Sequence, residues 1–122
     1  MHSMRILSKY FDCINNGTKK IEVRLNDEKR QQIKIGDEIT FKDLDNEERQ
    51  LIAKVTNVYY ENTFNDLLSR FDVSIFGDKD STKEELIEIL NKIYSKEEQD
   101  KYGVVGIEIR KNDWINDQSF FI

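Results

Sequence analysis

The chain has 122 residues with no proline, one cysteine and one histidine, and 35% of its residues are charged. This length is typical of one compact domain, residues 1–122, with room for one core, and no apolar run approaches the ~20 residues of a membrane span. One cysteine excludes an intramolecular disulfide framework, and one histidine argues against a histidine-based metal site. We therefore expect a soluble, cytoplasmic protein that needs no metal and no cofactor.

The formal net charge of −5 is unevenly distributed. Residues 1–42 carry nine Lys and Arg against six Asp and Glu, whereas residues 43–122 carry ten against eighteen. An acidic chain is poorly suited to coating duplex nucleic acid, because that mode depends on many phosphate contacts. A small site that holds one phosphate or one base is compatible with this charge.

In chain order, residues 4–7 predict a short strand and residues 9–15 a short helix, which Asn16 and Gly17 end as a left-handed cap. Residues 20–25 then alternate between apolar and charged, which predicts a half-buried strand. Its two faces are expected to be an inner one of Ile21, Val23 and Leu25 and an outer one of Lys20, Glu22 and Arg24.

A polar turn over residues 27–32 and a Gly36–Asp37 turn precede a second alternating strand, residues 38–42, with Ile39 and Phe41 inward. The acidic residues 43–48 predict a hairpin loop. Residues 50–60, rich in branched and aromatic side chains, form the longest predicted strand. One of its last two side chains, Tyr59 and Tyr60, should be buried and the other exposed.

Thr63 is expected to cap a short amphipathic helix in which Phe64, Leu67, Leu68 and Phe71 fall at helical spacing. Ser81 and Glu84 fit a capping box for the clearest helix, residues 82–94. Its predicted buried stripe consists of Leu86, Ile89, Leu90 and Ile93. Ser95 opens a further helical turn, residues 104–110 predict a final strand, and the apolar tail 114–122 should pack back on the domain or add a strand.

These elements do not alternate as βαβ units, so they favour the α+β class. The architecture that fits best is a small mixed or antiparallel β-barrel with inserted helices. The alternation places the following side chains in its interior: Ile21, Val23, Ile39, Phe41, Val55, Ile107 and Ile109.

The densest polar cluster is Lys19, Glu22 and Arg24 at the predicted helix-to-strand junction. Glu22 and Arg24 share one strand face, ~7 Å apart, and Lys19 comes just before the strand. These groups could hold a phosphate, read the edge of a base, or do acid–base work if burial shifted the lysine. The alternative is a row of ion pairs on an exposed strand face.

The same segment resembles the signature of ASCH domains, G-x-K-x-x-E-x-R, as Gly17, Lys19, Glu22 and Arg24. ASCH domains belong to the PUA-like superfamily of small β-barrels associated with RNA. The resemblance extends over most of the chain, since the segment IKIGDEITF, the strand ending in VYYENTFNDLL and the stretch IYSKEEQDKYGVVGIEI also look like those of small bacterial ASCH proteins.

The resemblance implies a PUA-like barrel with a polar cleft that binds RNA or a nucleotide-like ligand. Gly17, Lys19, Glu22 and Arg24 would be its ligand-binding residues. Some relatives are amidohydrolases acting on acetylcytidine, a modified nucleoside, and others are ribonucleases. Lys19 would then be the catalytic residue, although Glu22 stands where the amidohydrolases have a threonine.

Basic side chains beside the motif could touch a nucleic-acid backbone as peripheral contacts. They are Lys20, Lys29, Arg30 and Lys34. Ordinary solvated surface is the alternative for Lys29, Arg30 and Lys34. The expected partners are single-stranded or structured RNA, or a nucleotide-like small molecule, and no membrane.

Overall fold

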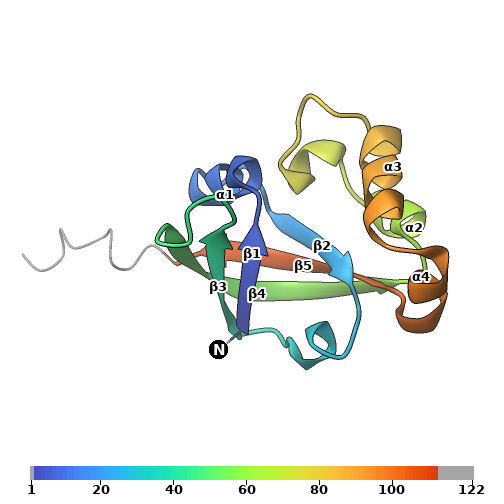
Figure 1. Ribbon diagram of the computed structural model, residues 1–122, viewed down its shortest axis with the longest axis horizontal. Helices are drawn as coiled ribbons and strands as arrows, with labels where there is room; N and C mark the ends of the chain where they lie inside the picture. The colour runs from blue at the N-terminus through green and yellow to red at the C-terminus, as the bar shows by residue number, and fades with distance from the viewer. Residues whose placement is uncertain (1, 113–122) are drawn as a thin grey trace, which may run out of the picture.

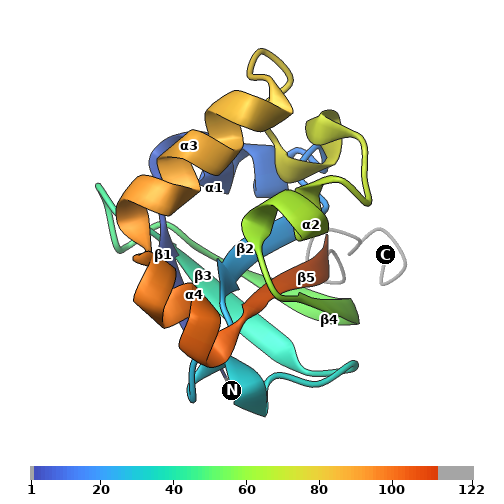
Figure 2. The same cartoon turned by 90° about the vertical axis from the view of Figure 1, so that its right-hand side faces the viewer.

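A computed structural model describes residues 2–112 as one curled five-stranded sheet with helices packed against it (Figures 1 and 2). Within this range, no helix is long and apolar enough to cross a membrane. The tail expected over 114–122 lies outside the described residues. The strands are β1 (His2–Ile6), β2 (Ile21–Leu25), β3 (Glu38–Asp43), β4 (Gln50–Glu61) and β5 (Val104–Lys111). The helices are α1 (Ser8–Asn15), α2 (Phe64–Leu68), α3 (Lys83–Ile93) and α4 (Lys96–Tyr102), with 3-10 turns η1 (Arg30–Gln32) and η2 (Val73–Phe76).

The strand order is β1-β3-β4-β5-β2, in which β1 runs parallel to β3 and every other neighbouring pair is antiparallel. This is a mixed, barrel-like sheet in an α+β fold, as predicted. The two edge strands, β1 and β2, do not pair with each other through backbone hydrogen bonds. Arg24 of β2 instead donates a hydrogen bond from Nη2 to the backbone carbonyl of Arg5 in β1, at 2.8 Å. Arg24 therefore links the two edges of the curled sheet.

Both faces of this sheet carry a core. The inner core holds side chains of β1, β3, β4, β5 and α1, among them Phe41 and Ile107, both fully buried. The outer core lies between β2, β5, α2, η2 and α3, and contains Ile21, Phe64 and Leu67. Because apolar side chains cover both faces, alternation alone cannot tell which face of a strand points into the barrel.

The predicted orientation of β2 is therefore wrong. In the register of β2 with β5, Glu22 pairs with Ile107 and Ile21 pairs with Glu108. Directly paired residues lie on the same face of a sheet, so the charged face of β2 is the one that shares the inner side with Ile107. Ile21 belongs to the outer core, and Val23 is half-buried against it.

The predicted start and buried stripe of α3 also need correction. Thr82 and Glu85, not Ser81 and Glu84, form the capping box, so the helix begins at Lys83. Ser81 instead lies in the turn before the helix, where its backbone N–H donates to the Asp78 carbonyl. Of the predicted stripe only Leu86 is buried, whereas Ile89 is 48% and Ile93 63% exposed and Leu90 is intermediate.

Other local predictions are confirmed. The Thr63 side chain caps α2 by accepting from the Asp66 N–H, and Ser95 opens α4 with a capping box. Ile39 and Phe41 are fully buried. At the end of β4, Tyr60 is exposed and Tyr59 packs against the outer core.

Candidate ligand-binding cleft

The signature segment begins with the turn that ends α1. Gly17 has φ +85°, a left-handed conformation that favours glycine. Its N–H donates to the Ile14 carbonyl and the Thr18 N–H to the Cys13 carbonyl, which is the hydrogen-bond pattern of a Schellman motif. The predicted cap is thus confirmed, and its role is to turn the chain so that Lys19 leaves the helix toward β2.

Glu22 lies at the centre of an ion-paired group with the two basic residues of the signature. It is only 7% exposed. One carboxylate oxygen lies 3.3 Å from the Lys19 ammonium. The other accepts from both Nε and Nη2 of Arg24, at 3.0 and 2.9 Å. The structure therefore brings the three predicted residues together, as one buried cluster and not as a row of exposed ion pairs.

The charges around Glu22 keep its carboxyl group ionised. Burial by itself raises the pKa of a carboxyl group, because it disfavours the charged form. Here the positive charges of Lys19 and Arg24, together with their hydrogen bonds, more than offset the burial, and the pKa of Glu22 lies below its ordinary value. The carboxylate is an acceptor at neutral pH and balances two buried cations.

Lys19 is held on several sides. Its ammonium donates to the backbone carbonyls of Ile21 and Phe76, each at 2.9 Å, in addition to its contact with Glu22. It also lies 4.9 Å from the centre of the Tyr10 ring. With three partners for three N–H donors, this lysine connects β2 to the end of η2.

Gly77 makes room for that lysine. It has φ +90°, and a Cβ added there would lie 2.9 Å from Cβ of Lys19. A side chain at residue 77 would thus meet both backbone strain and a clash. Sequence reasoning missed Gly77; the only signal was a Gly–Asp pair between two predicted helices, which is typical of a turn.

A second polar group, also missed from the sequence, lies beside the first. Asp78 is buried, and one of its oxygens accepts from the Lys9 ammonium at 2.8 Å and from the Tyr10 hydroxyl at 3.3 Å. The hydrogen bond from Lys9 holds the pKa of Asp78 below its ordinary value. Burial, and then the Asp78 charge, raise the pKa of Tyr10. No local pattern could find this group, because Lys9 and Asp78 are 69 residues apart.

These two groups form the polar side of a cleft of about 530 Å³ between α1, β2 and α3. Its polar lining includes Lys9, Asp78, Glu22 and Arg24. The opposite wall is the exposed apolar side of α3, with Ile89, Leu90 and Ile93, followed by Tyr94. The partly exposed stripe of α3 thus lines the cleft, which is half charged and half apolar.

The remaining predicted site residues do not line this cleft. Lys20 is exposed and lines a different pocket, described below. Lys29, Arg30 and Lys34 line neither of these two pockets. The turn η1, which contains Arg30, lies at the end of the molecule opposite α1 and α3 (Figures 1 and 2), and Arg30 pairs with Asp27. The chain after β2 thus leads away from the cleft, and a contact of these three side chains with nucleic acid stays a prediction.

Comparison with known proteins agrees with this geometry. The family model of the ASCH domain matches residues 4–113 of this chain. The chain belongs to the ASCH domain family. A search of curated proteins gives no match. Among residues 2–112, no group of three or more His, Cys, Asp or Glu could hold a metal ion.

Solved structures extend the likeness to the whole ASCH fold. The crystal structure of the hypothetical protein PH0355 is 34% identical with a TM-score of 0.80, covering 90% of this chain and 97% of that one. The solution structure of PF0455 from Pyrococcus furiosus is 33% identical with a TM-score of 0.73, covering 93% and 98%. An ASCH domain from Lactobacillus crispatus JV V101 is 15% identical with a TM-score of 0.60, covering 90% and 79%, and supports the fold alone.

Proposed function

We propose that this ASCH domain binds RNA, or one nucleotide within it, in the cleft lined by Glu22 and Arg24. The observation that carries the proposal is that the Arg24 side chain is fixed in place and keeps one hydrogen-bond donor free within the described residues. Glu22 and the Arg5 carbonyl take up its Nε and Nη2 donors, whereas Nη1 makes no hydrogen bond to any residue of the described range. With 17% of the side chain exposed, this fixed guanidinium can donate to a phosphate or to a base edge.

The apolar wall complements that donor. Sequence-specific RNA recognition targets unpaired bases, which pack on aromatic or apolar side chains and form hydrogen bonds along their edges. Ile93 and Tyr94 can cover the face of a base while Arg24 and the carboxylate of Asp78 lie across the cleft. A volume of about 530 Å³ is within the range of ordinary small-ligand sites.

The charge of the chain predicts few phosphate contacts. Each phosphate neutralised on a single strand steepens the dependence of log K on log salt by roughly 0.7. With a net charge of −5, we expect a slope that corresponds to fewer than six phosphates. A steeper slope would mean that RNA binds by bulk charge and not in the cleft.

Binding is favoured over catalysis because Lys19 is fully engaged. A lysine that acts as a base or activates a nucleophile needs an accessible, deprotonated amine. The Lys19 side chain is 5% exposed, and its ammonium is bound to a carboxylate and two carbonyls. We therefore assign Lys19 to positioning Glu22. Incubation with acetylcytidine or single-stranded RNA should give no product, and turnover abolished by Lys19→Ala would establish the hydrolase or ribonuclease alternative instead.

The proposal is tested by fluorescence anisotropy with a labelled single-stranded RNA. Arg24→Gln should weaken binding at least tenfold, because it removes the fixed donor. Arg70→Gln is the matched control, since Arg70 also pairs with a glutamate, Glu61, but lies outside the cleft. Circular dichroism should show both variants folded. Equal affinities for the two variants would contradict the proposal.

A further inference from the structure

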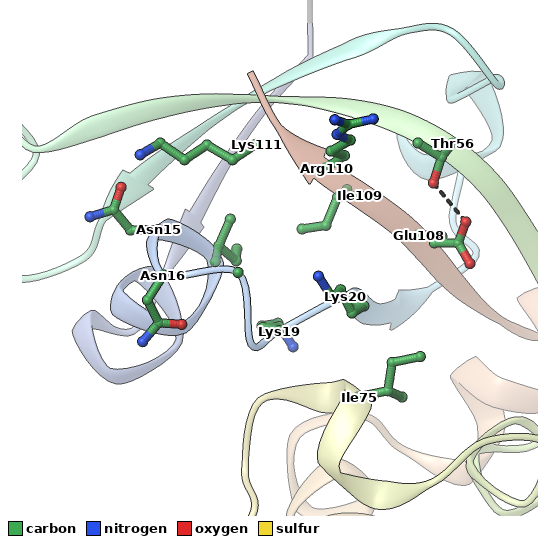
Figure 3. Close-up of a pocket in the computed structure, with 12 residues that line it drawn as sticks. Asn15, Asn16, Lys19, Lys20, Thr56, Ile75, Glu108, Ile109, Arg110 and Lys111 are labelled. Carbon is green, nitrogen blue, oxygen red and sulfur yellow. Dashed lines mark hydrogen bonds between the residues drawn. The ribbon is translucent and has the colours of Figure 1, made fainter. Parts of the chain in front are cut away.

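A second pocket, of about 520 Å³, lies between the end of α1, the start of β2 and the end of β5 (Figure 3). Its basic lining consists of Lys19, Lys20, Arg110 and Lys111. The backbone N–H of Lys20 donates to the carbonyl of Ile75 in η2 at 2.8 Å. The neighbouring residue, Lys19, lines both this pocket and the ASCH cleft. The second pocket is therefore adjacent to the ASCH cleft and shares Lys19 with it, whereas Lys20, Arg110 and Lys111 line the second pocket and not the cleft.

Two positive charges of this pocket are uncompensated in an acidic protein. No hydrogen bond or ion pair within residues 2–112 involves the Lys20 ammonium or the Arg110 guanidinium. The one carboxylate of the lining belongs to Glu108. Its two oxygens accept from the hydroxyls of Thr56 and Tyr59, at 2.7 and 3.0 Å, so both are occupied without a cation.

The backbone around Thr56 is shaped for this lining. The register of β4 with β5 shifts between Val55 and Asn57, which leaves Thr56 as the extra residue of a bulge. Bulges re-aim a side chain and are over-represented next to functional sites. Here the bulged threonine binds Glu108 (Figure 3), which ties that carboxylate to β4. Beyond the basic groups, Asn15 and Asn16 at the end of α1 add amide donors to the lining.

We propose that this pocket is an anion site that binds phosphate groups, either from the backbone of an RNA strand or from a free phosphorylated compound. An uncompensated lysine and arginine, with a further lysine and amide donors, supply the charge-assisted hydrogen bonds that phosphate oxygens accept. The site is separate from the proposed base-binding cleft, so neither needs the other in order to exist. The anion-site proposal depends on the proposed function only where it assigns the bound phosphates to an RNA strand.

The first test uses tripolyphosphate as the probe and calorimetry as the readout. The double variant Lys20→Gln/Arg110→Gln should weaken tripolyphosphate binding at least tenfold. The control, Lys96→Gln/Lys101→Gln, removes the same charge from exposed positions of α4 that lie outside this pocket. Equal weakening in the two double variants, or no binding to the wild type, would overturn the proposal.

A second measurement distinguishes the two sources of phosphate. If the pocket holds an RNA strand, the same double variant should reduce the salt slope for single-stranded RNA by roughly 0.7 for each phosphate that is no longer neutralised. If tripolyphosphate binding falls while RNA binding is unchanged, the ligand is a free phosphorylated compound. If Arg24→Gln loses RNA binding but Lys20→Gln/Arg110→Gln does not, the cleft proposal stands, whatever the tripolyphosphate measurement shows for the second pocket.

Discussion

Replacing Glu22 by Gln should destabilise the fold more than replacing any exposed charge would. The substitution keeps the shape but removes the negative charge between Lys19 and Arg24. Breaking a buried ion pair from one side costs about 3–5 kcal/mol, because an uncompensated charge stays buried. We expect the lower end, about 3 kcal/mol, since Lys19 keeps two carbonyl partners and Arg24 keeps the Arg5 carbonyl.

Thermal and urea unfolding measure this directly. With an unfolding entropy of about 2.1 cal/mol/K per residue, 3 kcal/mol corresponds to a Tm lower by ~12 °C for a chain of this length. Arg24→Gln should cost less, since Glu22 then still faces Lys19. The cost of the double variant should fall short of the sum of the two single costs by roughly 0.5–3 kcal/mol. Additive costs, or a Glu22→Gln cost below ~1 kcal/mol, would refute the idea of one coupled cluster.

The pH dependence gives an independent check. The pKa of Glu22 is lowered in the folded protein, so its charge contributes stability that is complete above the unfolded pKa of about 4.3. That contribution disappears as the pH falls through the lower, folded value. The stability difference between wild type and Glu22→Gln should thus be constant from about pH 7 to about pH 5 and shrink at more acidic pH. A difference that grows on acidification would contradict the assignment.

Three further predictions concern the free energy of unfolding and, for one of them, RNA affinity as well. Gly77→Ala should cost ~1–3 kcal/mol more than Gly17→Ala, because both glycines have positive φ but only a Cβ at residue 77 clashes with Lys19; equal costs would argue against that clash. Leu86→Ala should cost ~2–5 kcal/mol. Ile93→Ser should change stability by less than ~1 kcal/mol while weakening RNA binding, and unchanged RNA affinity would remove α3 from the cleft wall.

Much of the local structure could be predicted from the sequence because its signals are local. The Asn16–Gly17 cap, the caps at Thr63 and Ser95 and the alternation of β3 each depend on a few neighbouring residues, and the structure confirms them. The ASCH signature also brought Lys19, Glu22 and Arg24 together correctly, since all three lie within one turn and the strand that follows it. What they bind stays a prediction, as do the nucleic-acid partner and the cytoplasmic location.

Apart from the capping box of α3, which lies one residue later than predicted, the failures of prediction concern long-range packing. Alternation in β2 showed two different faces, but which one entered the barrel depended on the register with β5 and on α2 and α3 covering the other side. The stripe of α3 looked like core although all four of its residues line the cleft and only Leu86 is buried. The hydrogen bond of Asp78 with Lys9 and the close approach of Gly77 to Lys19 join segments that are far apart along the chain, and no spacing rule reaches that far.

The most direct test of the central claim is to map the bound RNA on the protein. Titration of the ¹⁵N-labelled chain with a short single-stranded RNA, followed by ¹H–¹⁵N correlation spectra, reports every backbone amide at once. A ligand in the ASCH cleft should shift the amides of Tyr10, Val23, Arg24, Asp78 and Leu90, which all line it, and leave those of η1 unchanged. Saturable binding with shifts confined to residues outside the cleft, or no shifts at millimolar RNA, would contradict the account.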